Sequence, residues 1–179
     1  MRNLQKVIYV ITHGEKNDGP NPSLTDYGKE QIRFFKECLP NVQKVVAGLA
    51  RRHLDMIEAL GLNFEECFFA DELGRATSLK PGTNDQVYLA DGTVIQRNKY
   101  IMLPASVVWE LVKNQPDSTL LLGGRPLAKA ILKFATNVPS PPEALTASLY
   151  EFTFKDGEIV NVKCQSAGKV EGDGYHKEV

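Results

Sequence analysis

Residues 7–15 read V-I-Y-V-I-T-H-G-E, an apolar run that turns abruptly into a polar loop. Val7, Ile8, Val10 and Ile11 are β-branched, and such a short apolar run is typical of a strand that is buried on both faces. The following loop, residues 13–23, holds two glycines and two prolines, which exclude a helix there. The stretch therefore predicts a buried strand with His13 just beyond its carboxyl end.

Strand-like and helix-like segments alternate outward from this stretch. Helices are expected over residues 25–39, 49–60, 104–114 and 126–134. Further strands are expected over residues 42–47, 66–70 and 118–122. Residues 147–154 and 158–162 flank the turn Asp156-Gly157 and predict a closing hairpin. This order predicts an α/β layer fold with a mostly parallel central sheet and an antiparallel edge hairpin.

Residues 71–103 are the least regular part of the chain. Residues 78–85 are expected to form a loop, and Asp91-Gly92 predicts a short hairpin between the apolar segments 87–89 and 93–95. We expect one domain over residues 1–162, with 71–103 as an insertion or lid. Residues 163–179 are polar and contain glycine, so they are expected to form a flexible tail.

The composition excludes several classes of protein. The chain has 179 residues, of which 42% are hydrophobic, and its net charge is -1, so it is expected to fold compactly and lacks the basic excess of nucleic-acid-binding proteins. No apolar run approaches the ~20 residues of a membrane span. The three cysteines form no C-x-x-C motif, and neither they nor the three histidines form a metal-ligand cluster. We expect a cytoplasmic protein with reduced thiols, no cofactor and no metal.

The loop after the first strand carries the first candidate group, because ligands of open α/β sheets bind beyond the carboxyl ends of the strands. His13 follows the strand directly, and Gly14 lets the backbone approach a ligand. A neutral imidazole at that place can attack phosphorus and carry a phosphoryl group. A loop histidine that hydrogen-bonds to the backbone fits the same pattern.

The helix after the second strand begins with Arg51 and Arg52, although the amino end of a helix favours anions. Two arginines there are explained by an anion bound in front of the helix. A pair of solvated surface arginines remains the alternative. His53 shares a helical stripe with Met56 and Ile57, so it is expected to be a half-buried packing residue.

The loop after the strand at 118–122 carries Gly123, Gly124 and Arg125. The two glycines permit a tight turn from the strand into a helix, whose amino end can hold an anion with the help of Arg125. A tight turn without a ligand fits this loop equally well.

Together these blocks resemble the histidine phosphatase superfamily, which has the phosphoglycerate-mutase-like three-layer fold. T-H-G-E at 12–15, followed by L-T-x-x-G-x-x-Q at 24–31, is similar to the R-H-G-E and L-T-x-x-G-x-x-Q of that family. Residues 47–60 align without gaps with S-S-P-L-x-R-A-x-x-T-A-E-A-L. Residues 120–131 are similar to V-x-x-H-G-G-x-I-R-A-L. The resemblance spans roughly residues 7–162.

The resemblance implies phosphoryl chemistry. In the family a histidine attacks phosphorus and becomes phosphohistidine, two arginines and a second histidine surround the phosphate, and a separate acid protonates the leaving group. The nucleophile falls on His13. The second arginine falls on Arg52, with Arg51 as its neighbour if the alignment is shifted by one residue.

Two positions depart from the family pattern. The first arginine falls on Thr12 and the second histidine falls on Gly123, so both are missing. Arg125 is close enough in sequence to supply the lost charge. His53 and His176 are not expected to replace the histidine, because the first is expected to face the core and the second lies in the expected tail.

The acid also departs from the pattern. Its usual position falls on Arg75, and Glu72 is the nearest candidate acid, with Asp71 beside it. Each lost charge-assisted hydrogen bond weakens stabilisation by about 1.5–3 kcal/mol, and a missing general acid slows a reaction ~10²–10⁴-fold.

The sequence therefore predicts a histidine-phosphatase-like protein with a degraded active site, which binds a phosphorylated small molecule or phosphoprotein with little or no turnover. The expected phosphate-binding residues are Thr12, Gly14, Arg51, Arg52, Gly123, Gly124 and Arg125. Two alternatives stay open. One is an active phosphomonoesterase that works through a phosphohistidine at His13 in a rearranged site. The other is an interaction or structural domain without a small-molecule site.

Overall fold

The computed structural model describes residues 4–19, 22–70, 76–80, 86–89, 94–96 and 105–167. Its strands are β1 (Gln5–Thr12), β2 (Lys44–Gly48), β3 (Phe68–Ala70), β4 (Ala76–Lys80), β5 (Gln86–Leu89), β6 (Val94–Gln96), β7 (Thr119–Gly123), β8 (Ser148–Lys155) and β9 (Glu158–Ser166). Its helices are α1 (Asp26–Phe34), α2 (Arg51–Ala59), α3 (Ala105–Lys113) and α4 (Arg125–Leu132), with the short 3₁₀ helices η1 (Phe35–Glu37) and η2 (Phe64–Glu66).

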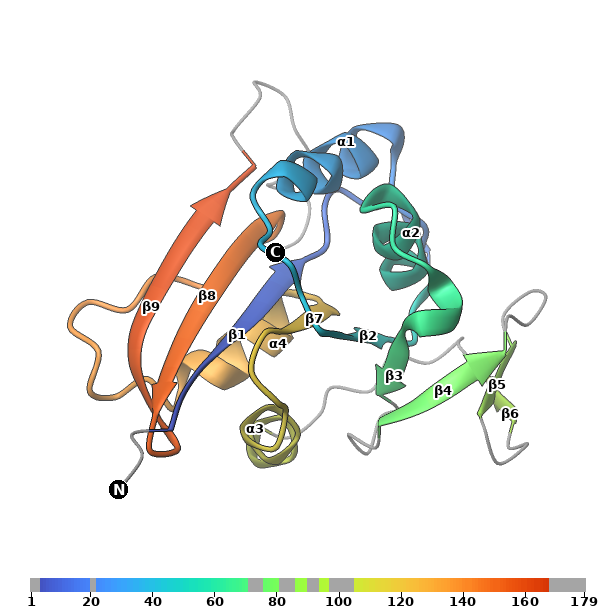
Figure 1. The fold of residues 1–179 in the computed structure, drawn as a ribbon. Helices are drawn as coiled ribbons and strands as arrows, with labels where there is room; N and C mark the ends of the chain where they lie inside the picture. Colours follow the sequence, from blue (N-terminus) through green and yellow to red (C-terminus); the bar gives the residue numbers. More distant parts are fainter. Residues whose placement is uncertain are drawn as a thin grey trace.

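The strands form a sheet in the order β6-β5-β4-β3-β2-β7-β1-β8-β9. The central strands β3, β2, β7 and β1 run parallel, and the strands on either side pair antiparallel. Figure 1 shows β8 and β9 beside β1 at one end of the sheet, and β4 and β5 at the other. The parallel strands at the centre of the sheet and the antiparallel edge hairpin β8–β9 are thus confirmed, and the antiparallel strands β4, β5 and β6 extend the other edge.

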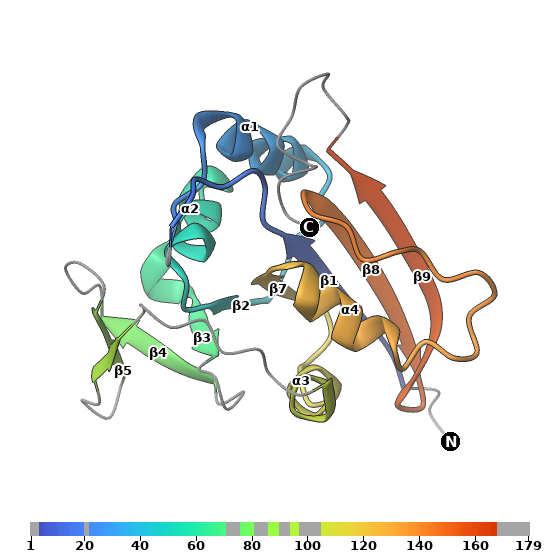
Figure 2. The same ribbon diagram turned by 180° about the vertical axis from the view of Figure 1, so that it is seen from behind.

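Two apolar layers cover the two faces of this sheet. Ile11 and Leu122 pack with Met56 of α2 on one face, whereas Val10 and Leu121 pack under α3 and α4 on the other. Because neighbouring strand residues point to opposite faces, the unbroken apolar runs of β1 and β7 supply both layers. Figure 2, seen from behind, shows α4 in front of β1, with α3 on the same side.

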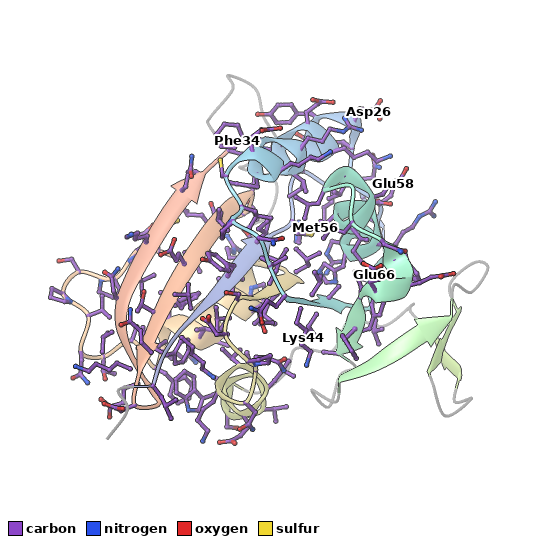
Figure 3. All side chains as sticks on the ribbon, viewed as in Figure 1. Asp26, Phe34, Lys44, Met56, Glu58 and Glu66 are labelled. Carbon is purple, nitrogen blue, oxygen red and sulfur yellow. The ribbon has the colours of Figure 1, made fainter. Side chains whose placement is uncertain are left out.

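The helices are amphipathic, as their spacing predicts. Figure 3 shows Met56 on the inner side of α2, while Glu58 lies on its outer side. Thr25 begins α1 as the N-cap, and its side chain accepts a hydrogen bond from the amide of Gly28 at 3.0 Å. The helix expected at 49–60 begins two residues later, at Arg51, so Arg51, Arg52 and His53 form its first turn.

Two expectations about irregular segments are wrong. Residues 163–166 are not tail but the end of β9, where Lys163 pairs with Glu151 and Ser166 with Ser148. These polar residues suit a strand at the edge of the sheet, where most side chains face solvent. Residues 78–80 belong to β4 rather than to a loop, because Ser78 pairs with Phe68 of β3.

The hairpin expected around Asp91-Gly92 is confirmed, since β5 pairs with β6 in the register Val87 to Ile95. The expected roles of 71–103 as a lid and of 168–179 as a tail lie outside the described side chains, as does Glu72. No helix in the described part of the chain is long and apolar enough to cross a membrane.

Candidate anion-binding site

The carboxyl ends of β1, β7 and β2 lie side by side. Thr12 pairs with Gly123, and Ala47 pairs with Leu122, so the three strands stop at one edge of the sheet. The next residue after β1 is His13, whose amide donates to the Gly123 carbonyl at 2.9 Å. The His13 carbonyl accepts from the amide of Ala147, also at 2.9 Å. The backbone of His13 is therefore fixed by the end of β7 and by the residue just before β8.

The loop after His13 is held by α1 through an unusually close backbone approach. A Cβ on Gly28 would lie 2.0 Å from the Glu15 carbonyl oxygen, and a Cβ on Gly14 would lie 2.5 Å from the Gly28 oxygen. The Gln31 side chain accepts from the Glu15 amide at 2.8 Å, and the Thr25 amide donates to the Glu15 carbonyl at 3.0 Å. The motif L-T-x-x-G-x-x-Q thus holds this loop in place through hydrogen bonds from Thr25 and to Gln31 and through the close packing of Gly28. Gly14 is required there for packing, whereas its expected part in ligand binding stays a prediction.

The imidazole of His13 is almost fully buried, at 4% exposure. Its Nδ1 lies 2.9 Å from the Gly14 carbonyl oxygen, which can only accept a hydrogen bond. The proton therefore sits on Nδ1, and Nε2 carries the lone pair. A Cβ on Gly124 would lie 3.4 Å from Nε2, so this edge of the ring faces the glycine turn between β7 and α4.

Burial lowers the pKa of His13 to about 3, helped by the positive charges of Arg52, Lys16 and Arg125 and opposed by the hydrogen bond to Gly14. His13 is therefore neutral at pH 7, as a nucleophile must be. The same three cations create a positive potential around its ring. Lys16 was missed in the sequence analysis, although it stands only three residues after His13.

The two arginines that begin α2 have different environments. Arg52 is 7% exposed and acts on His13, whereas Arg51 is exposed to solvent. The helical periodicity separates them, since adjacent residues of a helix point about 100° apart. The structure thus brings Arg52 and Arg125 into the surroundings of His13 and leaves Arg51 on the surface.

Two helices begin at this edge of the sheet without a side-chain cap. Their N-cap residues are Ala50 for α2 and Gly124 for α4, and neither first turn contains an acidic residue. The amino end of a helix carries amide groups without intrahelical partners and a partial positive charge. Together with the cations around His13, these two helix ends make the site suited to an anion.

His53 is buried, as a packing residue is expected to be, and it also lies close to His13. It is 5% exposed, and its ring centroid is 6.3 Å from that of His13. Because α2 begins at Arg51, residue 53 falls in its first turn, beside the end of β2. A Cβ on Gly48 would lie 2.2 Å from Nδ1 of His53, so the ring rests directly on the glycine backbone. The sequence signal was the position of His53 next to Arg52, which the apolar stripe obscured.

Thr12 and Gly123 have structural roles that the sequence did not reveal. The Thr12 hydroxyl donates to the Leu145 carbonyl at 2.7 Å and accepts from the Ser148 amide at 3.1 Å, so its single proton is already used. Its expected hydrogen bond to a phosphate is therefore not supported. A Cβ on Gly123 would lie 2.5 Å from Cδ2 of Leu127, which fills the space where a side chain would start.

We predict that His13 makes the stability of the protein depend on pH. Its pKa is about 3 in the folded protein and about 6.5 in the unfolded chain. Above pH 6.5 both states are neutral. Below it only the unfolded state gains the proton, so stability falls from pH 6.5 towards pH 3. Between pH 7 and pH 5 this lowers the free energy of unfolding by about 2 kcal/mol.

The check is urea unfolding of the wild type and of His13→Asn at both pH values. The asparagine amide can still donate to the Gly14 carbonyl but does not titrate, so the difference between the two proteins isolates His13. An equal loss of stability in both proteins would contradict the low pKa.

No group of three or more His, Cys, Asp or Glu residues in the described part of the chain could hold a metal ion. The site thus consists of imidazoles, cations, glycines and helix ends. Such groups are suited to bind an anion, and the lone pair on Nε2 of His13 is of the kind that can act as a nucleophile.

The comparisons with known proteins agree on the fold. No family model matches the sequence, and no curated protein matches it. Among solved structures, TTHB049 from Thermus thermophilus is 14% identical with a TM-score of 0.55, covering 87% of this chain and 98% of that one. The putative phosphohistidine phosphatase SixA from Nakamurella multipartitia is 14% identical with a TM-score of 0.56, over 89% and 95% of the two chains.

A phosphoglycerate mutase from Thermus thermophilus is 15% identical with a TM-score of 0.56, over 87% of this chain and 97% of the other. These likenesses establish the fold and not the activity, because the identities are low. The chain thus has a phosphoglycerate-mutase-like fold, which confirms the fold that the motifs predict.

Proposed function

We propose that this protein uses its histidine-phosphatase-like fold to bind a phosphate-bearing ligand at His13 and Arg52, and that it hydrolyses this ligand slowly or not at all. The ligand is a phosphorylated small molecule or a phosphoprotein. The observation that carries the proposal is the buried imidazole of His13, 4% exposed, with the cations Arg52, Lys16 and Arg125 near enough to act on it; burial first, and then these charges, lower its pKa. A bound anion would interact favourably with these three positive charges.

A phosphate monoester fits this site better than a carboxylate. Its terminal oxygens accept several hydrogen bonds at once, which suits a guanidinium fork and amide groups at helix ends. Two uncapped helix ends meet here, those of α2 and α4. The fold neighbours whose names mention phosphohistidine phosphatase and phosphoglycerate mutase support the same class of ligand.

Slow turnover is the part of the proposal that rests on missing groups. In the resembling family, a charged arginine precedes the nucleophile. Here that position holds Thr12, whose hydroxyl donates a hydrogen bond to the Leu145 carbonyl and accepts one from the Ser148 amide. Leu127 fills the space beside Gly123, where the family places a second histidine. The loss of one charge-assisted hydrogen bond corresponds to about 1.5–3 kcal/mol, roughly a 10- to 150-fold slower reaction.

An active phosphomonoesterase is the second candidate, and the tautomer of His13 favours it. The bond from Nδ1 to Gly14 leaves the lone pair on Nε2. In such a reaction Nε2 forms a bond to phosphorus while the ester P–O bond breaks, and the leaving oxygen takes a proton from an acid. Water then cleaves the N–P bond and releases phosphate.

Two paired measurements test these functions. The first is a calorimetric titration of the wild type with inorganic phosphate, and the second is hydrolysis of an aryl phosphate by the wild type and by His13→Asn across pH 4–8. We expect saturable phosphate binding and hydrolysis close to background in both proteins. Rapid hydrolysis that is lost in His13→Asn would instead establish the esterase. Absence of phosphate binding would contradict the proposal and favour an interaction domain.

A further inference from the structure

We infer that His53 is a second ligand-contacting imidazole of this site, so that the anion bound at His13 also touches the His53 ring. The inference rests on the proposed function and names a further residue of the same site. In the resembling family a second histidine at the position of Gly123, the end of β7, contacts the phosphate. Here the corresponding contact would come from His53 of α2.

The first observation is the position of the ring. His53 is 5% exposed and its ring centroid lies 6.3 Å from that of His13, with the ring planes tilted by 43°. Both imidazoles therefore belong to one buried cluster at the ends of β1 and β2. His53 also follows Arg52 directly in the first turn of α2, where the helix dipole attracts an anion.

The second observation is the space that the backbone leaves for the ring. Nδ1 and Cε1 of His53 lie within 2.2 and 2.6 Å of where a Cβ on Gly48 would be. Any other residue at 48 would push the ring away from this place. The His13 ring likewise packs against a glycine, because a Cβ on Gly124 would lie 3.4 Å from its Nε2 atom. Each histidine ring of the site thus lies against a glycine at the end of a parallel strand.

The third observation explains why the contact comes from α2. The space beside Gly123 is filled by Leu127, whose Cδ2 would lie 2.5 Å from a Cβ at 123. No side chain can enter the site from that strand end unless Leu127 moves. At the end of β2, by contrast, Gly48 has no side chain, and the ring of His53 from α2 occupies that place, 6.3 Å from the ring of His13.

The test uses inorganic phosphate as the probe and calorimetry as the readout. His53→Leu keeps most of the volume of the ring and removes both nitrogens, so a role in packing survives while a contact with the anion is lost. We expect its phosphate affinity to fall by about tenfold or more, the effect of one lost hydrogen bond to a charged group. Gly48→Ala, which displaces the ring without changing it, is expected to weaken binding in the same direction.

Met56→Leu is the matched control, because Met56 is buried on the same helix and packs into the core. Its phosphate affinity is expected to equal that of the wild type. Thermal unfolding without phosphate shows whether each variant is folded. In the wild type, the imidazole proton resonances of His53 are expected to shift on addition of phosphate.

The outcomes separate the two proposals. If the wild type binds phosphate and His53→Leu binds it equally well, His53 is a packing residue and this inference is overturned, while the proposed function stands. If the wild type does not bind phosphate at all, the proposed function and this inference fail together. Unchanged His53 resonances in a protein that binds phosphate would also overturn the inference.

Discussion

Alanine at position 28 is expected to destabilise the protein by about 3 kcal/mol, although the same change normally stabilises a helix. Gly28 lies in α1, and within a helix alanine is favoured over glycine by roughly 1 kcal/mol. Here the added Cβ would lie 2.0 Å from the Glu15 carbonyl oxygen, where no atom fits. The helix or the loop must move, and overpacking of this kind destabilises by about 1–3 kcal/mol or more.

The same movement is expected to weaken phosphate binding, because the displaced loop carries His13 and Gly14. Urea unfolding gives the change in stability, and a phosphate titration gives the change at the site. Lys29→Ala is the control, since it exchanges two good helix formers at the next position and is expected to change stability by less than about 0.5 kcal/mol. A Gly28→Ala protein as stable as the wild type would mean that α1 does not approach the loop so closely.

Most of the fold could be predicted because its signals are local. The apolar runs of β1 and β7 and the turn Asp156-Gly157 each depend on residues close in sequence. His13 was found for the same reason, since it directly follows a buried strand. The end of β9 was missed because an edge strand can be polar, and its residues 163–166 show no apolar alternation that would reveal their pairing with residues 148–151.

The parts of the site that were missed depend on contacts between distant residues. The hydroxyl of Thr12 is used by Leu145, 133 residues away, and no local pattern reveals such a partner. The place of His53 depends on where α2 begins, and helix boundaries are the least certain part of a pattern. Because α2 begins two residues later than expected, His53 lies in its first turn, beside Gly48, rather than further along its apolar stripe.

Arg52→Met is expected to lower the affinity for inorganic phosphate by about 100-fold or more, whereas Arg51→Met is expected to change it by less than about threefold. Arg52 is 7% exposed and close enough to His13 to lower its pKa, so it is placed to contact an anion bound there. A guanidinium commonly gives an anion two charge-assisted hydrogen bonds, and their loss accounts for the expected factor. Arg51 is exposed, so water and salt screen its charge.

These two arginines are neighbours of equal chemistry, so the comparison also decides the alignment that the sequence left open by one residue. Calorimetric titration of both variants with phosphate is the measurement. A second readout is the pKa of His13 by NMR, which is expected to rise in Arg52→Met because a nearby positive charge is removed. Arg52→Lys keeps the charge but not the planar fork, so it is expected to restore the pKa and only part of the affinity. Equal losses in Arg51→Met and Arg52→Met would show that general positive potential, rather than a direct contact from Arg52, holds the anion.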